Sequence, residues 1–227
     1  MVLKLLILGV MIFLLSTTAS SQCKNITDDH LSNKNTTIES AQRLVPVFIK
    51  NSFSIGEEKT NDDKKWIVMK ADYSALIKAD LETLSSILMD YEEMPRIFKN
   101  IENVKVVDTL VDGVITKQTT IVRGLGFSFR NTLHFKISNK MVSPDVFTQT
   151  FSLHKGDKAT LKTEGSWTVE SLEASRGCIV SYQTKNIILH QYPLQDAVMA
   201  AFGATEIKKL FFELCEVIDR RGQDNGF

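Results

Sequence analysis

The 227-residue sequence predicts an α+β fold, in which a curved antiparallel sheet of about seven strands wraps around a long C-terminal helix. Three observations support this prediction. One strand pattern is followed by two short helical segments that meet at Pro95. About six further strand patterns then follow at hairpin spacing, which indicates antiparallel pairing. The last segment, from Pro193 to about residue 220, has helical periodicity and no internal proline.

The first predicted strand covers residues 66–79. Its apolar and polar side chains alternate with a period of two, which is typical of a half-buried strand. Asp80 can then cap a helix with its side chain. Leu81, Leu84 and Leu88 recur at helical spacing. This pattern predicts an amphipathic helix directly after the first strand.

Pro95 interrupts that helix. Proline lacks a backbone N–H and crowds the preceding turn, but it fits the first turn of a new helix. We therefore expect the chain to bend at Glu93–Met94 and to restart as a second short helix. The inner side of that helix would include Ile97 and Phe98.

The remaining strand patterns are separated by turn signals, such as the Val-Asp-Gly segment at residues 111–113. They fall at residues 103–110, 114–123, 127–138, 145–154, 159–172 and 177–189. In the helix that follows, Asp196 lies near the start, and Arg220 and Arg221 lie near the end. These charges agree with the helix dipole.

The N-terminal segment, residues 1–21, has the features of a signal peptide. It contains one Lys, an apolar run over residues 5–15 and small residues before the cleavage position. The run is short for a permanent membrane span, although an uncleaved anchor is the alternative. We expect cleavage after Ser21 and export to the periplasm or the extracellular space. The other predicted boundaries are a polar leader (22–63), the folded domain (64–221) and a tail (222–227).

Charge and cysteine content narrow the functional classes. Lys+Arg and Asp+Glu both number 27, and this balance argues against nucleic acid as a partner, which requires a basic surface. No Cys-x-x-Cys motif occurs and no two histidines have metal-ligand spacing, so we expect no metal. Cys178 and Cys215 have apolar neighbours. They fit two buried thiols or, in an oxidising compartment, one disulfide.

The helical corner and its exit carry a family resemblance. The stretch ADLETLSSILMDYEEMPRIFKNIENVKVVD, residues 79–108, contains Asp90-Tyr91, Met94-Pro95 and Asn100-Ile101. It resembles the START/Bet v 1-like (SRPBCC, helix-grip) superfamily, in particular the polyketide cyclase/dehydrase and coenzyme-Q-binding branch, over about residues 64–220. The resemblance implies a hydrophobic cavity between the sheet and the long helix, where family members hold lipids, sterols, quinones or polyketides. The predicted export signal departs from the intracellular members, which puts their ubiquinone-chaperone and polyketide-synthesis roles in doubt.

Catalytic motifs do not emerge from the sequence, so we predict no catalytic residue and no cofactor. No Gly-x-Ser-x-Gly segment occurs, and no pair of carboxylates lies in an apolar setting. The segment RGLGFSF, residues 123–129, lacks the strand-to-helix context of a phosphate loop. Its glycines are interpreted as a bend in a curved sheet. In a helix-grip fold the same segment could also gate the mouth of the cavity.

Eight residues are candidates for ligand binding. A buried polar atom needs a partner, and Tyr73, Gln149 and Tyr182 each share a strand face with apolar neighbours. Such groups either orient the polar part of an apolar ligand or bond to one another or to buried water. The aromatic candidates either line a cavity or pack as an ordinary core. The full set is Tyr73, Phe129, Gln149, Phe151, Trp167, Tyr182, Met199 and Phe202.

These observations lead to three hypotheses. The first is an exported binding or carrier protein for a hydrophobic small molecule or lipid, without enzymatic activity and with transient membrane contact. The second is a cyclase- or hydrolase-type enzyme that acts on an apolar substrate in the same cavity. It requires Tyr73, Gln149 and Tyr182 to converge on one point. The third is a secreted interaction module, which would expose a large apolar patch.

Overall fold

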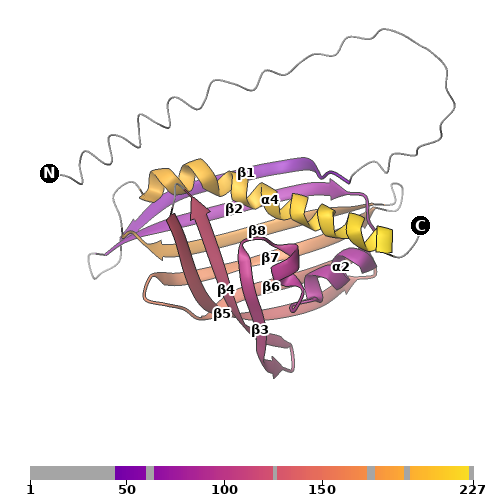
Figure 1. The fold of residues 1–227 in the computed structure, drawn as a ribbon, viewed down its shortest axis with the longest axis horizontal. Helices are drawn as coiled ribbons and strands as arrows, with labels where there is room; N and C mark the ends of the chain where they lie inside the picture. Colours follow the sequence, from indigo (N-terminus) through magenta and orange to yellow (C-terminus); the bar gives the residue numbers. More distant parts are fainter. Residues whose placement is uncertain (1–43, 60–63, 125–126, 173–176, 192–194, 225–227) are drawn as a thin grey trace, which may run out of the picture. The chain divides into compact units, whose positions relative to one another are not determined.

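The computed structural model describes residues 44–59, 64–124, 127–172, 177–191 and 195–224, apart from a few side chains that include those of residues 122–129. Figure 1 shows one sheet with a long helix across one face and a short helical corner beside it. The predicted signal peptide, most of the predicted leader before Leu44 and the end of the tail lie outside the described residues.

The strands form a single antiparallel sheet in the order β1-β2-β8-β7-β6-β5-β4-β3. Their bounds are β1 (Val47–Lys59), β2 (Lys65–Ile77), β3 (Ile101–Leu110), β4 (Gly113–Gly124), β5 (Phe127–Ser143), β6 (Val146–Lys155), β7 (Thr160–Leu172) and β8 (Gly177–Leu189). The helices are α2 (Leu81–Met89), α3 (Met94–Ile97) and α4 (Gln195–Asp224). The predicted α+β architecture, with two short helices after a strand and a long C-terminal helix, is confirmed.

The described part of the sheet has eight strands, one more than the approximate number of seven that the sequence predicts. The additional strand, β1, lies in the segment that the sequence analysis assigned to the polar leader, so ordered chain begins before residue 64. It pairs with β2 from Val47–Leu76 to Lys59–Lys65. β1 is an edge strand, and most of its side chains are exposed. Its sequence therefore lacks the clear alternation of apolar and polar residues that a half-buried strand shows.

The helical corner follows the predicted order. The N-cap residue Asp80 accepts a hydrogen bond from the backbone N–H of Thr83 at its Oδ1, at 2.7 Å. The short helix α3 contains Pro95 in its first turn, as a helix start allows. The N–H of Phe98 donates to the carbonyl of Met94 at 2.8 Å, and the chain then leaves as β3.

The helices cover one face of the sheet, which we call the concave face. The long helix α4 packs against β1, β2 and α3, while α2 packs against β6 and β7. The buried core lies between this face and the helices. It includes Val169 and Val180 from the sheet, Leu88 from α2, and Phe211 and Leu214 from α4.

Cys178 in β8 and Cys215 in α4 are buried and free, which agrees with the first of the two alternatives, two buried thiols. Burial raises the pKa of Cys178 to about 11 and that of Cys215 to about 12. Both thiols are therefore protonated near neutral pH and behave as apolar core groups. Within the described ranges, no helix combines the length and the apolar character that a membrane span needs.

Candidate ligand-binding site

Four of the predicted site residues form one row across the concave face. Tyr73 of β2 lies opposite Tyr182 of β8, Tyr182 lies opposite Trp167 of β7, and Trp167 lies opposite Gln149 of β6. Residues that lie directly opposite each other in adjacent strands point to the same face. Asn139 of β5 extends the row beyond Gln149. We call these five residues the central row.

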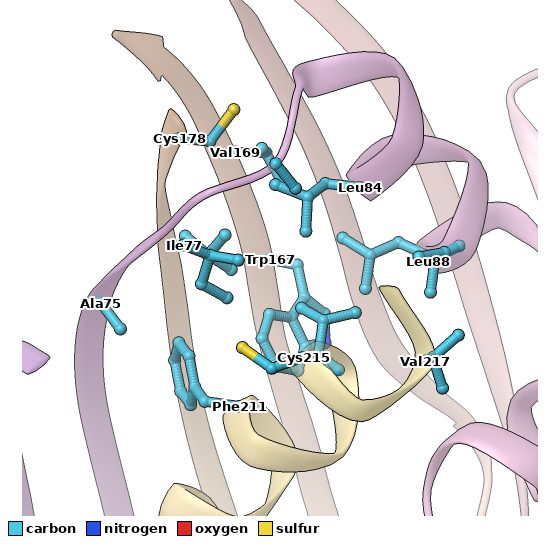
Figure 2. Packing of buried hydrophobic residues seen from close by; sticks show 14 of the residues in the cluster. Ala75, Ile77, Leu84, Leu88, Trp167, Val169, Cys178, Phe211, Cys215 and Val217 are labelled. Carbon is cyan, nitrogen blue, oxygen red and sulfur yellow. The ribbon is translucent and has the colours of Figure 1, made fainter. Parts of the chain in front are cut away.

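On one side of the central row the concave face is apolar. The residues of this apolar end are Ala75, Ile77, Val169, Cys178 and Val180, which are all fully buried. Figure 2 shows that Leu84 and Leu88 of α2 and Phe211 of α4 point into the same region. The apolar end is therefore covered by side chains from both helices.

On the other side of the central row the same strands carry small and polar side chains. The residues of this polar end are Thr163, Gly165, Thr184 and Asn186. The Thr184 hydroxyl donates to the carbonyl of Glu164 at 3.1 Å and accepts a hydrogen bond from Nδ2 of Asn186 at 3.4 Å. The polar end thus presents hydrogen-bonding groups without a formal charge.

Gln149 is 2% exposed, and its amide is bonded within the protein. Its Nε2 donates to the carbonyl of Leu88 at 2.8 Å and to Oδ1 of Asn139 at 3.0 Å. Asn139 donates in turn to the hydroxyl of Tyr91 at 2.6 Å. This series of hydrogen bonds ties the end of α2 to β5 and β6. Gln149 therefore acts as a clamp beside the apolar end, and both of its N–H groups are used.

Aromatic rings fill the centre of the concave face. The ring centroid of Trp167 lies 4.5 Å from that of Tyr182 and 5.6 Å from that of Phe211. Phe151 stacks on Tyr182 with centroids 6.1 Å apart. Gly165 allows this stack, because a Cβ at that position would lie 2.5 Å from Cζ of Phe151. A glycine in the middle of β7 is therefore explained by the close approach of this ring and of the carbonyl oxygen of Gln183.

The apolar core on the concave face is divided into two clusters. The larger cluster contains the apolar end and most of the central row, and the smaller cluster consists of Leu133, Phe135 and Ile137 of β5. Phe151 packs against both clusters but is only half-buried, and so is Tyr182 beside it. A close-packed interior would bury such central rings completely. The region between Tyr182, Phe151 and the smaller cluster is our candidate site.

Burial raises the pKa of Tyr182 to about 12, and a hydrogen bond with Thr184 acts in the opposite direction. Burial also raises the pKa of Tyr73. Both phenols are therefore protonated at neutral pH, and Tyr182 can donate a hydrogen bond. The large shift at Tyr182 fits a ring deep in the fold. The accessible surface that this ring retains fits open space beside it.

The other predicted site residues take different positions. Met199 and Phe202 lie in the N-terminal half of α4, where Met199 is half-buried and Phe202 is 43% exposed. In the same half, Gly203 packs so closely on β1 that a Cβ would lie 2.2 Å from the ring of Phe53. Phe129 belongs to β5, but its side chain lies outside the described residues, as do the other side chains of RGLGFSF.

Sequence reasoning did not identify Gly165, Thr184 or Asn186. For Gly165 a signal existed, since an isolated glycine inside a strand pattern marks a close approach. For Thr184 and Asn186 the signal was their alternation with Tyr182 along β8. Among the described residues, no group of His, Cys, Asp and Glu side chains is placed to hold a metal ion.

No family model and no curated protein sequence matches this chain. Solved structures do match it. The aromatase/cyclase Zhui from a Streptomyces species has a TM-score of 0.56 and 12% identity, over 70% of this chain and 98% of that chain. The STAR-related lipid transfer protein of Xanthomonas axonopodis has a TM-score of 0.51 and 12% identity, over 70% and 98%. Human StAR-related lipid transfer protein 5 has a TM-score of 0.51 and 8% identity, over 81% and 90%.

These structural neighbours are START/Bet v 1-like proteins, and the chain shares their helix-grip fold. The predicted resemblance is therefore confirmed at the level of the fold. With identities of 12% and below, the similarity is one of backbone architecture.

Proposed function

We propose that this protein is an exported binding or carrier protein for a hydrophobic small molecule or lipid, held between the concave face and α4. The observation that carries the proposal is the divided core, in which Phe151 and Tyr182 keep accessible surface between two apolar clusters. The structural neighbours support it, because two of them are lipid transfer proteins and the third is an aromatase/cyclase.

Binding would be driven by removal of apolar ligand surface from water, at about 25 cal/mol per Å². Phe151 and Tyr182 would contribute ring faces on one side of the ligand. The smaller cluster on β5 would contribute aliphatic and aromatic contacts on the other. This arrangement is typical of small-molecule sites, which are mostly apolar with a few polar groups.

Entry of a ligand would require the start of α4 to move. The C-terminal half of this helix is held by Arg221, whose Nη2 lies 3.2 Å from Oδ2 of Asp90. Glu216 and Lys99 form a second ion pair at 3.2 Å. The N-terminal half instead exposes the apolar side chains Val198 and Phe202. These side chains are suited to transient contact with a membrane during loading or release.

The catalytic alternative gains less support from the same geometry. It requires Tyr73, Gln149 and Tyr182 to meet at one point, but Trp167 lies between Gln149 and Tyr182 in the central row. Both N–H groups of Gln149 are also bonded to the protein. Binding without chemistry is therefore the function that we propose.

The test uses native purification, followed by solvent extraction and mass spectrometry of any bound molecule. The chain has two tryptophans, so a Trp66→Phe variant leaves Trp167 as the single reporter beside the candidate site. We expect a hydrophobic compound to co-purify. Adding it back to delipidated protein should change the emission of Trp167 in a saturable way.

Leu161→Ala provides the matched control, because that side chain is exposed. The control should retain full binding, whereas Phe151→Ala should weaken it. Absence of any co-purified hydrophobic compound, together with an unchanged Trp167 emission on titration with lipid extracts, would overturn the proposed function.

Export is supported by the composition of residues 1–21. Expression of the full chain in a secretion-competent host should yield an exported form whose N-terminus is Gln22, as measured by intact mass. Recovery of only the uncleaved chain from inside the cell would contradict this part of the proposal.

A further inference from the structure

We infer that the ligand is a neutral amphiphile whose hydroxyl or carbonyl group binds at the polar end, against Thr184 and Asn186. This inference rests on the proposed function and specifies the chemistry of the bound molecule. It follows from three features of the concave face, namely the polar groups on β8, the location of charged residues and the closure of the apolar end.

The first feature is a line of uncharged polar groups along β8. Tyr182, Thr184 and Asn186 alternate onto the concave face, where their partners on β2 are Tyr73, Ala71 and Met69. Successive members lie about 6.7 Å apart along the strand. They begin at the half-buried aromatic centre and lead away from the apolar end. A ligand body at Tyr182 would therefore have polar groups within reach on one side only.

These groups can both donate and accept hydrogen bonds. Asn186 gives one N–H to Oγ1 of Thr184 and can offer its second N–H and its carbonyl oxygen to a ligand. The Tyr182 phenol stays protonated, and its oxygen can accept a hydrogen bond while its proton faces Thr184. A hydroxyl, ester or ketone finds partners in such a set, since each needs only one or two neutral donors or acceptors.

The second feature is the absence of charge around these groups. Lys185 follows Thr184 in β8 but alternates to the opposite, convex face, where it pairs with Lys70 and lies opposite Glu164. Among the described strand residues, the charges with concave-face phase include Glu57, Lys59 and Lys65 at one margin of the sheet and the exposed Lys155 at the last position of β6. Lys65 and Glu57 pair with each other at 2.5 Å. An ionised ligand would lose its hydration without a charged strand neighbour directly opposite Thr184 or Asn186.

The third feature is the closure of the opposite end. The amide of Gln149 is bonded to Leu88 and Asn139, and the apolar end beyond it is filled by side chains from α2 and α4. A ligand therefore meets no free polar group at the apolar end. Beside the smaller cluster, the hydroxyl of Thr116 in β4, opposite Phe135, is buried without a hydrogen-bond partner among the described residues. All of these groups are uncharged, so a neutral ligand with an apolar part and a polar part is the pattern that fits.

The experiment compares four twelve-carbon probes, which are 1-dodecanol, dodecane, dodecanoate and dodecylammonium, at a pH where both ions are fully charged. Binding is followed by Trp167 emission in delipidated full-length protein that carries Trp66→Phe. We expect dodecanol to bind at least about tenfold more tightly than either ion, because the site lacks a counter-charge. Dodecane has no polar group, so its affinity should not depend on the side chains of the polar end.

Two variants locate the polar group. Asn186→Leu and Thr184→Val should each weaken dodecanol about three- to tenfold, the worth of one neutral hydrogen bond, and should leave dodecane unchanged. Because Thr184 also donates to Glu164, Asn186→Leu is the variant that separates recognition from folding. Gln183→Leu, with its exposed side chain on the convex face, is the matched control.

The outcomes are distinguishable. Equal affinities for dodecanol, dodecanoate and dodecylammonium, or an unchanged dodecanol affinity in Asn186→Leu, would overturn the inference and leave the proposed function standing. Failure of all four probes to bind would overturn the proposed function and the inference together.

Discussion

The apolar end and the polar end of the concave face differ in their side chains but share one backbone. The pairing of β2 with β8 runs from Trp66–Leu189 to Ile77–Cys178 without a register shift. At the apolar end, Ile77 and Val180 are met by α2 and α4 and are fully buried. At the polar end the same two strands present smaller or polar groups such as Thr184. The difference between the two ends therefore arises from side-chain choice on a regular sheet rather than from a break in it.

The largest effect is expected from breaking the apolar end at Phe211. This side chain is fully buried, and its ring lies 5.3 Å from that of Phe48. Phe211→Ala leaves a cavity and should reduce the free energy of unfolding by about 3–5 kcal/mol, as measured by urea denaturation. Phe202→Ala, on the exposed half of the same helix, should cost less than about 1 kcal/mol. If both variants lost the same unfolding free energy, the two halves of α4 would not differ in how much they stabilise the fold.

A smaller effect is expected from filling the polar end at Gly165. A Cβ there would lie 2.2 Å from the carbonyl oxygen of Gln183 as well as close to Phe151, so backbone and ring must both shift. Gly165→Ala should cost about 1–3 kcal/mol in unfolding free energy. It should also weaken ligand binding. Gly56→Ala in β1 is the control, because nothing lies within 4 Å of its Cβ. A stable variant with normal ligand affinity would contradict the role given to Gly165.

Removing the clamp between the two ends should have a comparable or slightly smaller effect. Gln149→Leu keeps the size of the side chain but leaves the carbonyl of Leu88 and Oδ1 of Asn139 without this donor. We expect a loss of about 1–2 kcal/mol in unfolding free energy. Ligand affinity should change little in protein that remains folded. A large loss of affinity at unchanged stability would instead place Gln149 in direct contact with the ligand.

The smallest effect concerns the cap of α2, which covers the apolar end. Hydrogen bonding from the Thr83 backbone lowers the pKa of Asp80 in the folded protein. This carboxylate therefore contributes stability above its unfolded pKa of about 3.9, and the contribution is lost as pH falls through the folded pKa. Asp80→Ala should cost about 1 kcal/mol at pH 7 and less at low pH. Unfolding curves measured across this range check the sign, and a loss that grows on acidification would contradict it.

The sequence predicts the local features of this fold well and the partners across strands poorly. Pro95 places the helical corner, and alternation gives β8 its observed bounds of Gly177–Leu189. The edge strand β1 was assigned to the polar leader because most of its side chains, including Ser52 and Ser54, are exposed. Only Phe53 and Ile55 alternate with them as half-buried groups.

For the site, alternation identified which side chains face inward but not which of them meet. Tyr73 and Tyr182 could be assigned to inner faces from their own strands. Their position opposite each other depends on the register between β2 and β8, which is set by tertiary pairing. The bond from Gln149 to the carbonyl of Leu88 depends on how α2 docks, and no local pattern encodes it.

The pairing of β2 with β8 has a consequence for how the chain folds. Its partners are separated by roughly 100 residues or more along the sequence, so this contact closes late and at a high entropic cost. Until β8 arrives, the free edge of β2 and its apolar face stay uncovered. We expect an unpaired edge of this kind to favour aggregation of the partly folded chain. The hairpins from β3 to β7 are the units that can form before β8 pairs with β2.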